Sequence, residues 1–261
     1  MSITSGLTPL ISYLNTTDEG KPKELKDYDQ NFKDYIFDTV LLAPKDPNFF
    51  TYKFLCNISQ SLGMGDALCI KESPFSLMNI TMSGQFSTHL MTSLYAGFIL
   101  AFPYVFWEIW RFIIPALKDS ETKVTRGVVF FSSFLFLLGV LFGYYVIAPL
   151  SINFLGSYQV SQTVANQISL TSFVTTVTTV SLANGIIFEL PILVYFLTKI
   201  GFLTPDFMRT YRRHAMVITL ILSAIITPPD ITSQILVSFP LIILYEISIR
   251  ISRAVIKRNN L

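Results

Sequence analysis

The chain has 261 residues, of which 51% are hydrophobic and only 14% are charged, and its formal net charge is +2. Ordinary soluble domains carry about 25% charged residues, so the chain is either an integral membrane protein or an unusually apolar soluble one. This composition excludes an intrinsically disordered chain, and so small a net charge excludes a nucleic-acid-binding surface. Residues 1–88 hold 7 Lys and 10 Asp or Glu, whereas residues 89–261 hold 12 Lys or Arg and 7 Asp or Glu.

Five apolar runs predict membrane-spanning helices. They cover residues 90–110, 127–150, 170–198, 215–226 and 231–249, and the second has no charged residue in 24 positions. About 20 apolar residues of helix cross a bilayer core of about 30 Å, and no soluble helical domain needs so long an uncharged run. Strands of a membrane β-barrel would instead alternate over about ten residues. The sequence therefore predicts an all-α integral membrane protein, a multi-span helical bundle.

The distribution of basic residues predicts the orientation. All 12 Lys and Arg after residue 88 follow the first, third or fifth run, and residues 143–169 and 227–230 contain none. The positive-inside rule places the basic connections and the C-terminus in the cytoplasm and residues 1–88 outside. No segment within residues 1–33 is apolar enough to span a membrane. A membrane-spanning helix that would carry residues 1–88 to the outside is therefore expected but not seen in this part of the sequence.

Glu189 is the most informative single residue. It lies ten residues before Lys199, or about 15 Å along a helix, which places it near the middle of the bilayer core. A carboxyl group there is costly, so we expect either a functional polar site or a protonated Glu hydrogen-bonded to threonine hydroxyls in the bundle. Near the last helix end, Glu246 has Arg250 four residues later as a natural ion-pair partner.

Other polar residues have simpler interpretations when taken alone. Glu121 lies in a short cytoplasmic turn, Asp230 follows two prolines as a helix N-cap does, and Thr204 before Pro205 predicts another N-cap. Cys56 and Cys69 both fall in the outside segment, where a disulfide would close a loop of about 14 residues worth roughly 3 kcal/mol. Whether they are bonded stays open at this point.

The sequence offers no support for an enzyme. It contains no GxxxxGK[ST] phosphate loop, no HExxH and no GxSxG, and its two histidines are far apart. We therefore expect no catalytic residues, no metal and no cofactor.

Several strings in order resemble the TatC family, the multispanning core of the twin-arginine protein translocase. The resemblance covers about residues 34–254 and rests on these strings: Phe102-Pro103, residues 107–117 (WEIWRFIIPAL) followed by Glu121, residues 188–191 (FELP), residues 209–213 (RTYRR), residues 227–230 (TPPD) with Ser233-Gln234, Pro240, Tyr245-Glu246, and Leu42-Ala43-Pro44. It implies six helices with both ends in the cytoplasm, forming a concave, glove-like scaffold, where this chain shows five spans.

The resemblance also implies a function. Such a subunit binds twin-arginine signal peptides and moves folded proteins across the bacterial cytoplasmic (inner) membrane, using the proton-motive force and single-span partners of the TatA/TatB type. Self-association is expected as well. The family pattern assigns arginine recognition to Phe112 and Glu121, the intramembrane polar site to Glu189, and periplasmic cap or structural roles to Pro44, Asp230 and Gln234. The pairing of acidic side chains with guanidinium groups is chemically apt, since such hydrogen bonds are charge-assisted and often bidentate.

The expected organisation has four parts: a divergent polar segment at residues 1–33 in place of the family's first span, a first periplasmic loop region at 34–88, the transmembrane bundle at 89–254 and a cytoplasmic tail at 255–261. Because the first span is missing, we expect poor insertion and weak peptide binding, with Glu121 as the remaining surface carboxylate. A divergent, misannotated or engineered start would each explain residues 1–33. Two other functions remain open: a proton-coupled small-solute transporter that uses Glu189, and a membrane scaffold without a substrate.

Overall fold

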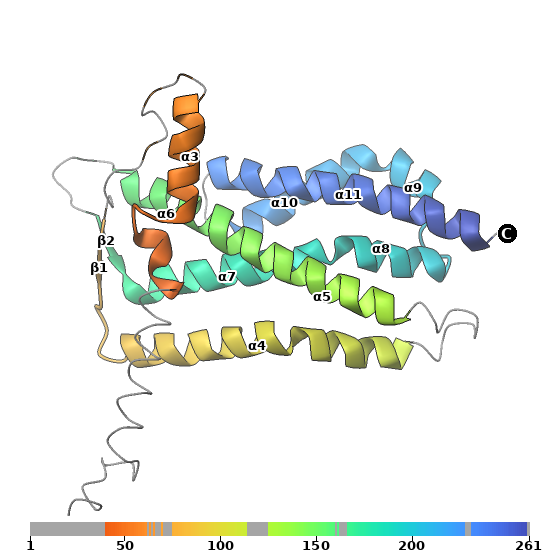
Figure 1. Ribbon diagram of the computed structural model, residues 1–261, viewed down its shortest axis with the longest axis horizontal. Coiled ribbons are helices and arrows are strands. Elements are labelled where there is room, and N and C mark those ends of the chain that lie inside the picture. The colour runs from red at the N-terminus through yellow and green to blue at the C-terminus, as the bar shows by residue number, and fades with distance from the viewer. Residues whose placement is uncertain are drawn as a thin grey trace, which may run out of the picture. The chain divides into compact units, whose positions relative to one another are not determined.

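A computed structural model of the chain describes residues 40–61, 63, 65, 69, 75–113, 125–159, 161, 166–227 and 231–259. The chain divides into two compact units, Met1–Ala43 and Pro44–Leu261, and the fold is that of the second. After the 3-10 turn η3 (Ala43–Lys45) at the boundary, the elements are α3 (Phe50–Ser61), β1 (Ser76–Met78), α4 (Gly84–Ile113), α5 (Thr125–Phe142), the π-helical turn η6 (Gly143–Ile147), α6 (Ala148–Ser157), β2 (Gln167–Ser169), α7 (Leu170–Phe188), α8 (Leu190–Lys199), α9 (Pro205–Thr210), α10 (Arg212–Ile226) and α11 (Ile231–Asn259) (Figure 1).

Long apolar helices dominate the second unit. Among the described residues, four helical stretches are long and apolar enough to cross a membrane, namely Gly84–Phe112, Gly127–Ser157, Leu170–Lys199 and Gln234–Lys257. The predicted all-α, multi-span membrane bundle is thus confirmed. The fourth predicted run, residues 215–226, forms α10, which has only 15 residues, so it extends about 22 Å and falls short of a core of about 30 Å.

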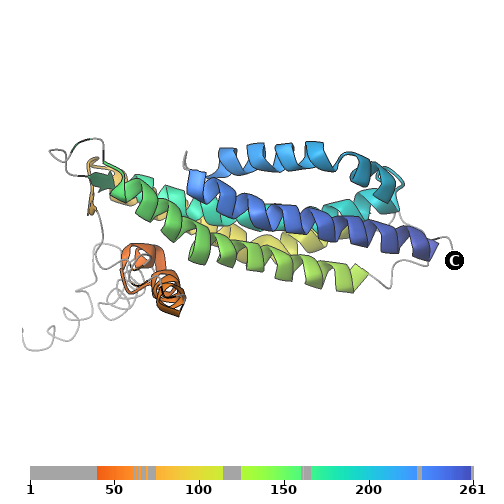
Figure 2. The ribbon, with the colours of Figure 1, turned by 90° about the horizontal axis from the view of Figure 1, so that it is seen from above.

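The long helices run side by side in both views (Figures 1 and 2). α7 packs against α5 and α4, whereas α11 packs against α8 and α10. One buried cluster, Phe102, Phe136 and Val140, joins α4 to α5, and the Phe102 and Phe136 rings stack with their centroids 3.6 Å apart. A second, Ile147, Val180, Val237 and Leu241, joins η6, α7 and α11.

The second span is longer than the sequence predicts because it passes through a π-helical turn. Pro149 has no N–H, so it cannot bond the carbonyl of Tyr145 one turn earlier. The backbone widens at this point, and the Ala148 N–H bonds the carbonyl of Gly143, five residues back. The helix then continues to Ser157 instead of ending near residue 150.

A short parallel ladder links the chain before α4 to the chain before α7. Ser76–Met78 pairs with Gln167–Ser169, with Leu77 opposite Ile168. The ring of Phe75 lies over Gly156, where an added Cβ would come within 2.3 Å of it. This contact requires glycine and secures one end of the ladder on α6.

Hydroxyl side chains cap two helices at their first turns. The Ser169 Oγ accepts a hydrogen bond from the Ser172 N–H at the start of α7. The predicted cap at Thr204 is confirmed: its Oγ1 accepts from the Phe207 N–H at 3.3 Å, and Pro205 is the first residue of α9. Each cap satisfies one of the N–H groups that a helix start leaves without a partner.

Candidate functional site

Glu189 is the single residue between two helices. α7 ends at Phe188 and α8 begins at Leu190, so the third predicted span is broken where the sequence suggested continuity. Pro191 explains the break, because it has no N–H to bond the carbonyl of Ile187 and its ring crowds the preceding turn. The Glu189 side chain therefore leaves the backbone at a point where two helix ends meet inside the bundle.

The Glu189 carboxyl group is only half satisfied. The Ser132 Oγ, on the facing α5, donates a hydrogen bond of 2.7 Å to Oε2. Oε1 is buried and has no hydrogen-bond partner among the described residues. Since Ser132 is itself fully buried, the interaction lies well inside the protein and leaves Oε1 as a buried acceptor without a donor among the described residues.

The partner of Glu189 differs from the one suggested by the sequence. Threonine hydroxyls of the bundle were the expected donors, but two threonines of α7 bond their own helix: Thr176 donates to the Ser172 carbonyl and Thr178 to the Val174 carbonyl. Such bonds to the preceding turn are a common use of threonine in apolar helices. Ser132 lies 57 residues away in sequence, so its role depends on helix packing.

Small residues bring α5 close enough to α7 for this contact. A Cβ added to Gly139 would lie 2.7 Å from the carbonyl oxygen of Asn184, and one added to Gly143 would lie 2.7 Å from the Cα of Ser181. On the facing helix, a Cβ at Gly185 would lie 2.6 Å from Val140. The Gly139-xxx-Gly143 and Ser181-xxx-Gly185 spacings form the close-packing pattern of membrane helices. Sequence analysis missed this glycine seam, although the Gly-xxx-Gly spacing was visible in the second apolar run.

The predicted peptide-recognition residues lie at and beyond the end of α4. Phe112 is 86% exposed, one residue before the helix ends. Its neighbour Arg111 lies 3.7 Å from Glu108, an exposed pair of little energetic weight. Glu121 lies outside the described residues. The structure thus gives an uncovered aromatic side chain at this end of the bundle.

Pro44 is held in a contact that the sequence did not reveal. It is fully buried, and its carbonyl oxygen lies 2.9 Å from the Tyr52 hydroxyl, which also lies 2.8 Å from the carbonyl oxygen of Pro149. Burial raises the pKa of the Tyr52 hydroxyl above its ordinary value. The neighbouring Thr51 donates to the carbonyl of Tyr145, the group that Pro149 leaves without its helical partner. α3 is therefore attached to the membrane helix at its π turn.

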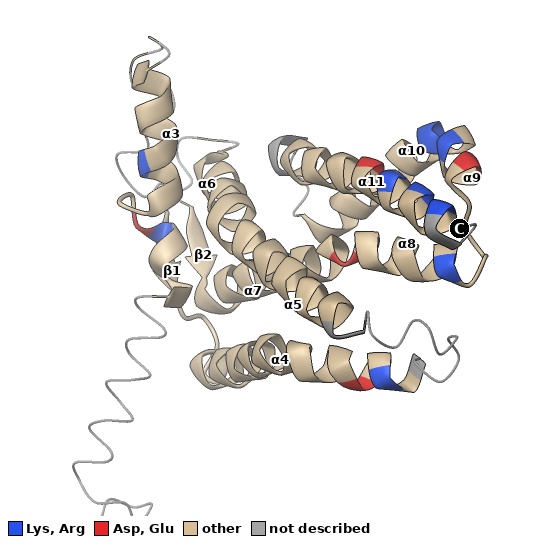
Figure 3. Cartoon of the chain, turned by 45° about the vertical axis from the view of Figure 1, so that its right-hand side comes forward, with Lys and Arg blue, Asp and Glu red and all other residues tan. Residues whose placement is uncertain are grey.

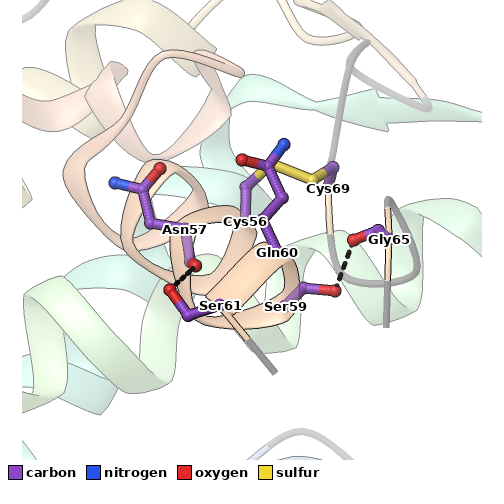
Figure 4. Close-up of a disulfide and its surroundings, with 7 residues drawn as sticks. All are labelled: Cys56, Asn57, Ser59, Gln60, Ser61, Gly65 and Cys69. Carbon is purple, nitrogen blue, oxygen red and sulfur yellow. Dashed lines mark hydrogen bonds between the residues drawn. A yellow bond between two sulfur atoms is a disulfide. The ribbon is translucent and has the colours of Figure 1, made fainter. Parts of the chain in front are cut away.

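Cys56 and Cys69 form a disulfide (Figure 4), with their Cα atoms 4.4 Å apart. The bond ties α3 to the segment that follows it. Ser59 reinforces the same connection by donating to the Gly65 carbonyl at 2.7 Å.

The remaining predicted residues lie around α10 and α11. The Gln234 side chain donates to the carbonyl of Leu220 at 3.3 Å, which joins the two helices near their connection. Asp230 lies outside the described residues. The expected pair of Glu246 and Arg250 is replaced: the Arg212 Nη2 lies 2.9 Å from the Glu246 Oε2, so the ion pair connects α10 to α11.

The comparisons with known proteins agree on one family. A family model described as Sec-independent protein translocase protein (TatC) matches residues 30–240. Curated relatives named Sec-independent protein translocase protein TatC include one from Blattabacterium sp. subsp. Periplaneta americana, 40% identical over 87% of this chain and 86% of its own length. A second, from Helicobacter pylori strain J99, is 42% identical over 61% of this chain and 64% of its own length.

A solved structure gives the same result. The crystal structure of a twin arginine translocase receptor, TatC, has a TM-score of 0.60 and 30% identity to this chain, covering 87% of this chain and 97% of its own. A second crystal structure of that receptor, in DDM, gives a TM-score of 0.61 at 31% identity. The stretch matched by the family model includes Glu189 and its flanking Leu190-Pro191, and the chain belongs to the TatC family of protein translocase subunits.

Proposed function

We propose that this chain is the subunit that binds twin-arginine signal peptides and takes part in moving folded proteins across the bacterial cytoplasmic membrane with the proton-motive force. Family membership supports a role in protein translocation. The observation that carries the peptide-binding step is Phe112, an aromatic ring 86% exposed at the end of α4. Glu121, nine residues later, would supply the charged acceptor for a guanidinium group.

The orientation assigned to the bundle supports this placement. Figure 3 shows Lys and Arg gathered at the end where α8 and α11 terminate, and α4 ends there as well. We place this end in the cytoplasm, where signal peptides arrive, and the C-terminus with it. α3, which holds Cys56 of the disulfide, lies at the opposite end (Figure 1), in agreement with an oxidising exterior.

In this function the chain acts by binding and positioning, with no covalent step. Among the described residues, no group of three or more His, Cys, Asp or Glu could hold a metal ion. The partners would be single-span subunits of the TatA/TatB type, further copies of this chain and the lipid bilayer. α4 supports such association, because it leaves large apolar side chains such as Leu94 and Leu100 exposed along its length.

The test is a binding measurement with the purified chain in lipid nanodiscs. A fluorescent twin-arginine signal peptide should bind more tightly than the same peptide with two lysines, because an ammonium group lacks the guanidinium fork. Glu121→Gln should weaken binding roughly 10- to 150-fold, since a hydrogen bond to a charged group contributes about 1.5–3 kcal/mol. Phe112→Ala should also weaken binding, whereas Phe86→Ala, a comparably exposed ring at the other end of α4, should not.

Equal affinity for the two peptides, or equal effects of the two phenylalanine changes, would contradict this assignment. The small-solute transporter remains the alternative for Glu189, but the relatives are named protein translocase subunits, which favours a protein cargo.

A further inference from the structure

Helix α3 leaves two aromatic rings largely uncovered by the rest of the described chain. Phe50 is 66% exposed and Phe54 is 54% exposed, and the two rings stack with their centroids 6.0 Å apart. The buried residues Tyr52 and Ser59 lie on the opposite side of the helix, about 160–180° around from Phe50. α3 therefore faces the protein with one side and presents both rings to its surroundings with the other.

The outer side of α3 is divided into an apolar edge and a polar edge. At about 100° per residue, Phe54 lies about 40° around the helix from Phe50, and the half-buried Ile58 lies about 40° further. Ser61, the last residue of α3, interrupts this edge, and its hydroxyl donates to a carbonyl one turn earlier. The exposed polar residues lie on the other side of Phe50, within about 80° of it: Lys53, Asn57 and Gln60. Aromatic residues along one edge and a lysine on the other are typical of helices that lie in a membrane interface.

α3 also has the orientation of such a helix. It runs crosswise to the membrane-spanning helices in Figure 1, and in Figure 2 it is seen almost along its own axis. Because the membrane-spanning helices follow the direction across the bilayer, α3 lies along the plane of the membrane. Phe50 and Phe54 are about 6 Å apart along this axis, so both rings lie at about the same depth.

The contacts of Phe50 indicate what that depth is. Its ring meets the Tyr145 ring edge to face, with the centroids 6.2 Å apart, and the neighbouring Phe49 ring stacks on Tyr145 at 5.5 Å. Tyr145 is itself exposed and lies in the second membrane-spanning stretch, 18 positions (145 minus 127) after its start at Gly127. That distance is about 27 Å of helix, close to the thickness of a hydrocarbon core of about 30 Å. The exposed rings of α3 thus continue the lipid-facing surface of the bundle at its outer edge, where aromatic side chains gather in membrane proteins.

We propose that α3 is an interfacial helix whose apolar edge is buried in the outer leaflet of the bilayer. Phe50, Phe54 and Ile58 enter the boundary between head groups and acyl chains, and Lys53 stays among the head groups. This places α3 on the membrane surface, within the region predicted as the first periplasmic loop. Continuity with the lipid-facing surface at Tyr145 selects lipid as the occupant.

Such an anchor would act on the second membrane-spanning stretch. The Tyr52 hydroxyl donates to the Pro149 carbonyl at 2.8 Å, and the Thr51 hydroxyl donates to the Tyr145 carbonyl. α3 is thereby attached to the membrane helix on both sides of the bond between η6 and α6. A helix fixed at the outer interface in this way holds the π turn at a constant depth.

Photo-crosslinking identifies the molecule that covers the rings. p-Benzoylphenylalanine in place of Phe54 exchanges one aromatic side chain for another. After irradiation in nanodiscs of phosphatidylethanolamine and phosphatidylglycerol, the intact mass of the chain should show an added phospholipid. The same substituent in place of Lys53 is the matched control, because this side chain points about 100° away, and it should give at least about five-fold less lipid adduct. Equal lipid adducts at the two positions, no lipid adduct at position 54, or a cross-linked dimer there would each overturn the proposal.

Hydrogen exchange in the same nanodiscs measures how strongly the lipid contact holds α3. Phe54→Ser should speed exchange of the α3 amides roughly 3- to 12-fold, the factor expected when about half of a phenylalanine side chain loses its apolar environment. Lys53→Ser introduces the same side chain one residue earlier and should change the rate less than about two-fold, because a side chain on the polar edge gives up no lipid contact. The mass of the intact Cys56–Cys69 disulfide checks that both variants are folded. Equal exchange rates in the two variants would contradict an anchoring role for the apolar edge.

Discussion

The glycine seam between α5 and α7 makes a quantitative prediction. In Gly139→Ala the new methyl group would lie 2.7 Å from the Asn184 carbonyl oxygen and 2.8 Å from the Phe188 Cβ, whereas ordinary contacts begin near 3.4 Å. The helices must therefore move apart by about 0.7 Å (3.4 minus 2.7). The nearest neighbour is backbone, which cannot rotate away, so we expect the cost of an overpacked interior, about 1–3 kcal/mol.

Gly97→Ala isolates this packing cost from the intrinsic preference of helices for alanine. Both glycines lie in the interior of a membrane-spanning helix, so both changes gain the same helix propensity of up to about 1 kcal/mol. The Gly97 position has nothing within 4 Å of the added Cβ. The difference between the two variants should therefore equal the packing cost alone.

Thermal unfolding in one detergent is the assay. At about 2–4 °C per kcal/mol for a chain of this size, Gly139→Ala should unfold roughly 2–12 °C below Gly97→Ala. The same displacement would separate Ser132 from Glu189, so we expect export to fall as well in Gly139→Ala. Equal unfolding temperatures for the two variants would refute the role of the seam in bringing α5 to α7.

Three further predictions concern the other parts of the site. Glu189→Ala should leave a folded chain, as checked by size-exclusion chromatography. The same variant should impair export of a twin-arginine cargo in cells that lack their own subunit. Normal export by both Glu189→Ala and Glu189→Gln would instead make Glu189 a structural polar group only. In a chain carrying Ser161→Cys, a membrane-impermeant thiol reagent should label intact cells, since Cys56 and Cys69 are bonded to each other; labelling only after lysis would reverse the proposed orientation. Tyr52→Phe should lower the unfolding free energy by about 1–3 kcal/mol at pH 7, because buried carbonyls lose their donor. Burial raises the pKa of Tyr52, so the contribution of its neutral hydroxyl to stability should be complete below the ordinary tyrosine pKa near 10 and should decline as pH rises above that value. In a pH series, the Tyr52→Phe variant should lack this decline in unfolding free energy.

The membrane helices were predictable because the signal for them is local. A run of uncharged apolar residues and the position of basic residues are properties of a short window, and the structure places helices at all five predicted runs. The internal irregularities were less predictable. Pro149 and Pro191 were both visible, yet the first widens a helix that continues and the second separates two helices. That outcome depends on what the neighbouring elements offer to the freed carbonyls, as the Thr51 hydroxyl does for Tyr145.

Among the site residues, too, local features were predictable and long-range contacts were not. Glu189 stood out because a carboxyl group in an apolar run is costly wherever it points. Its donor, Ser132, was hidden because a serine in an apolar helix is unremarkable until packing places it opposite an acid. The partner of Glu246 was predicted from helix spacing as Arg250, but Arg212 approaches from α10. Long-range pairs of this kind depend on the positions of whole helices and cannot be read from intervals within one of them.

The half-satisfied state of Glu189 bears on how the proposed function would work. A buried polar group without a partner costs about 1–3 kcal/mol, and more if it is charged. Hydroxyls near it in sequence do not help, since Ser181 and Thr178 donate to their own helix. A carboxyl group with a purely structural role would be more stable with a second hydrogen-bond donor from this chain. None of the described residues donates a hydrogen bond to Oε1. In the function proposed here, that oxygen, buried in the isolated subunit, would accept a hydrogen bond from a polar group of a second chain within the membrane once the helices around it separate. Binding would then be favoured by a contact that the isolated subunit leaves unmade, and assembly would stabilise the helix break itself.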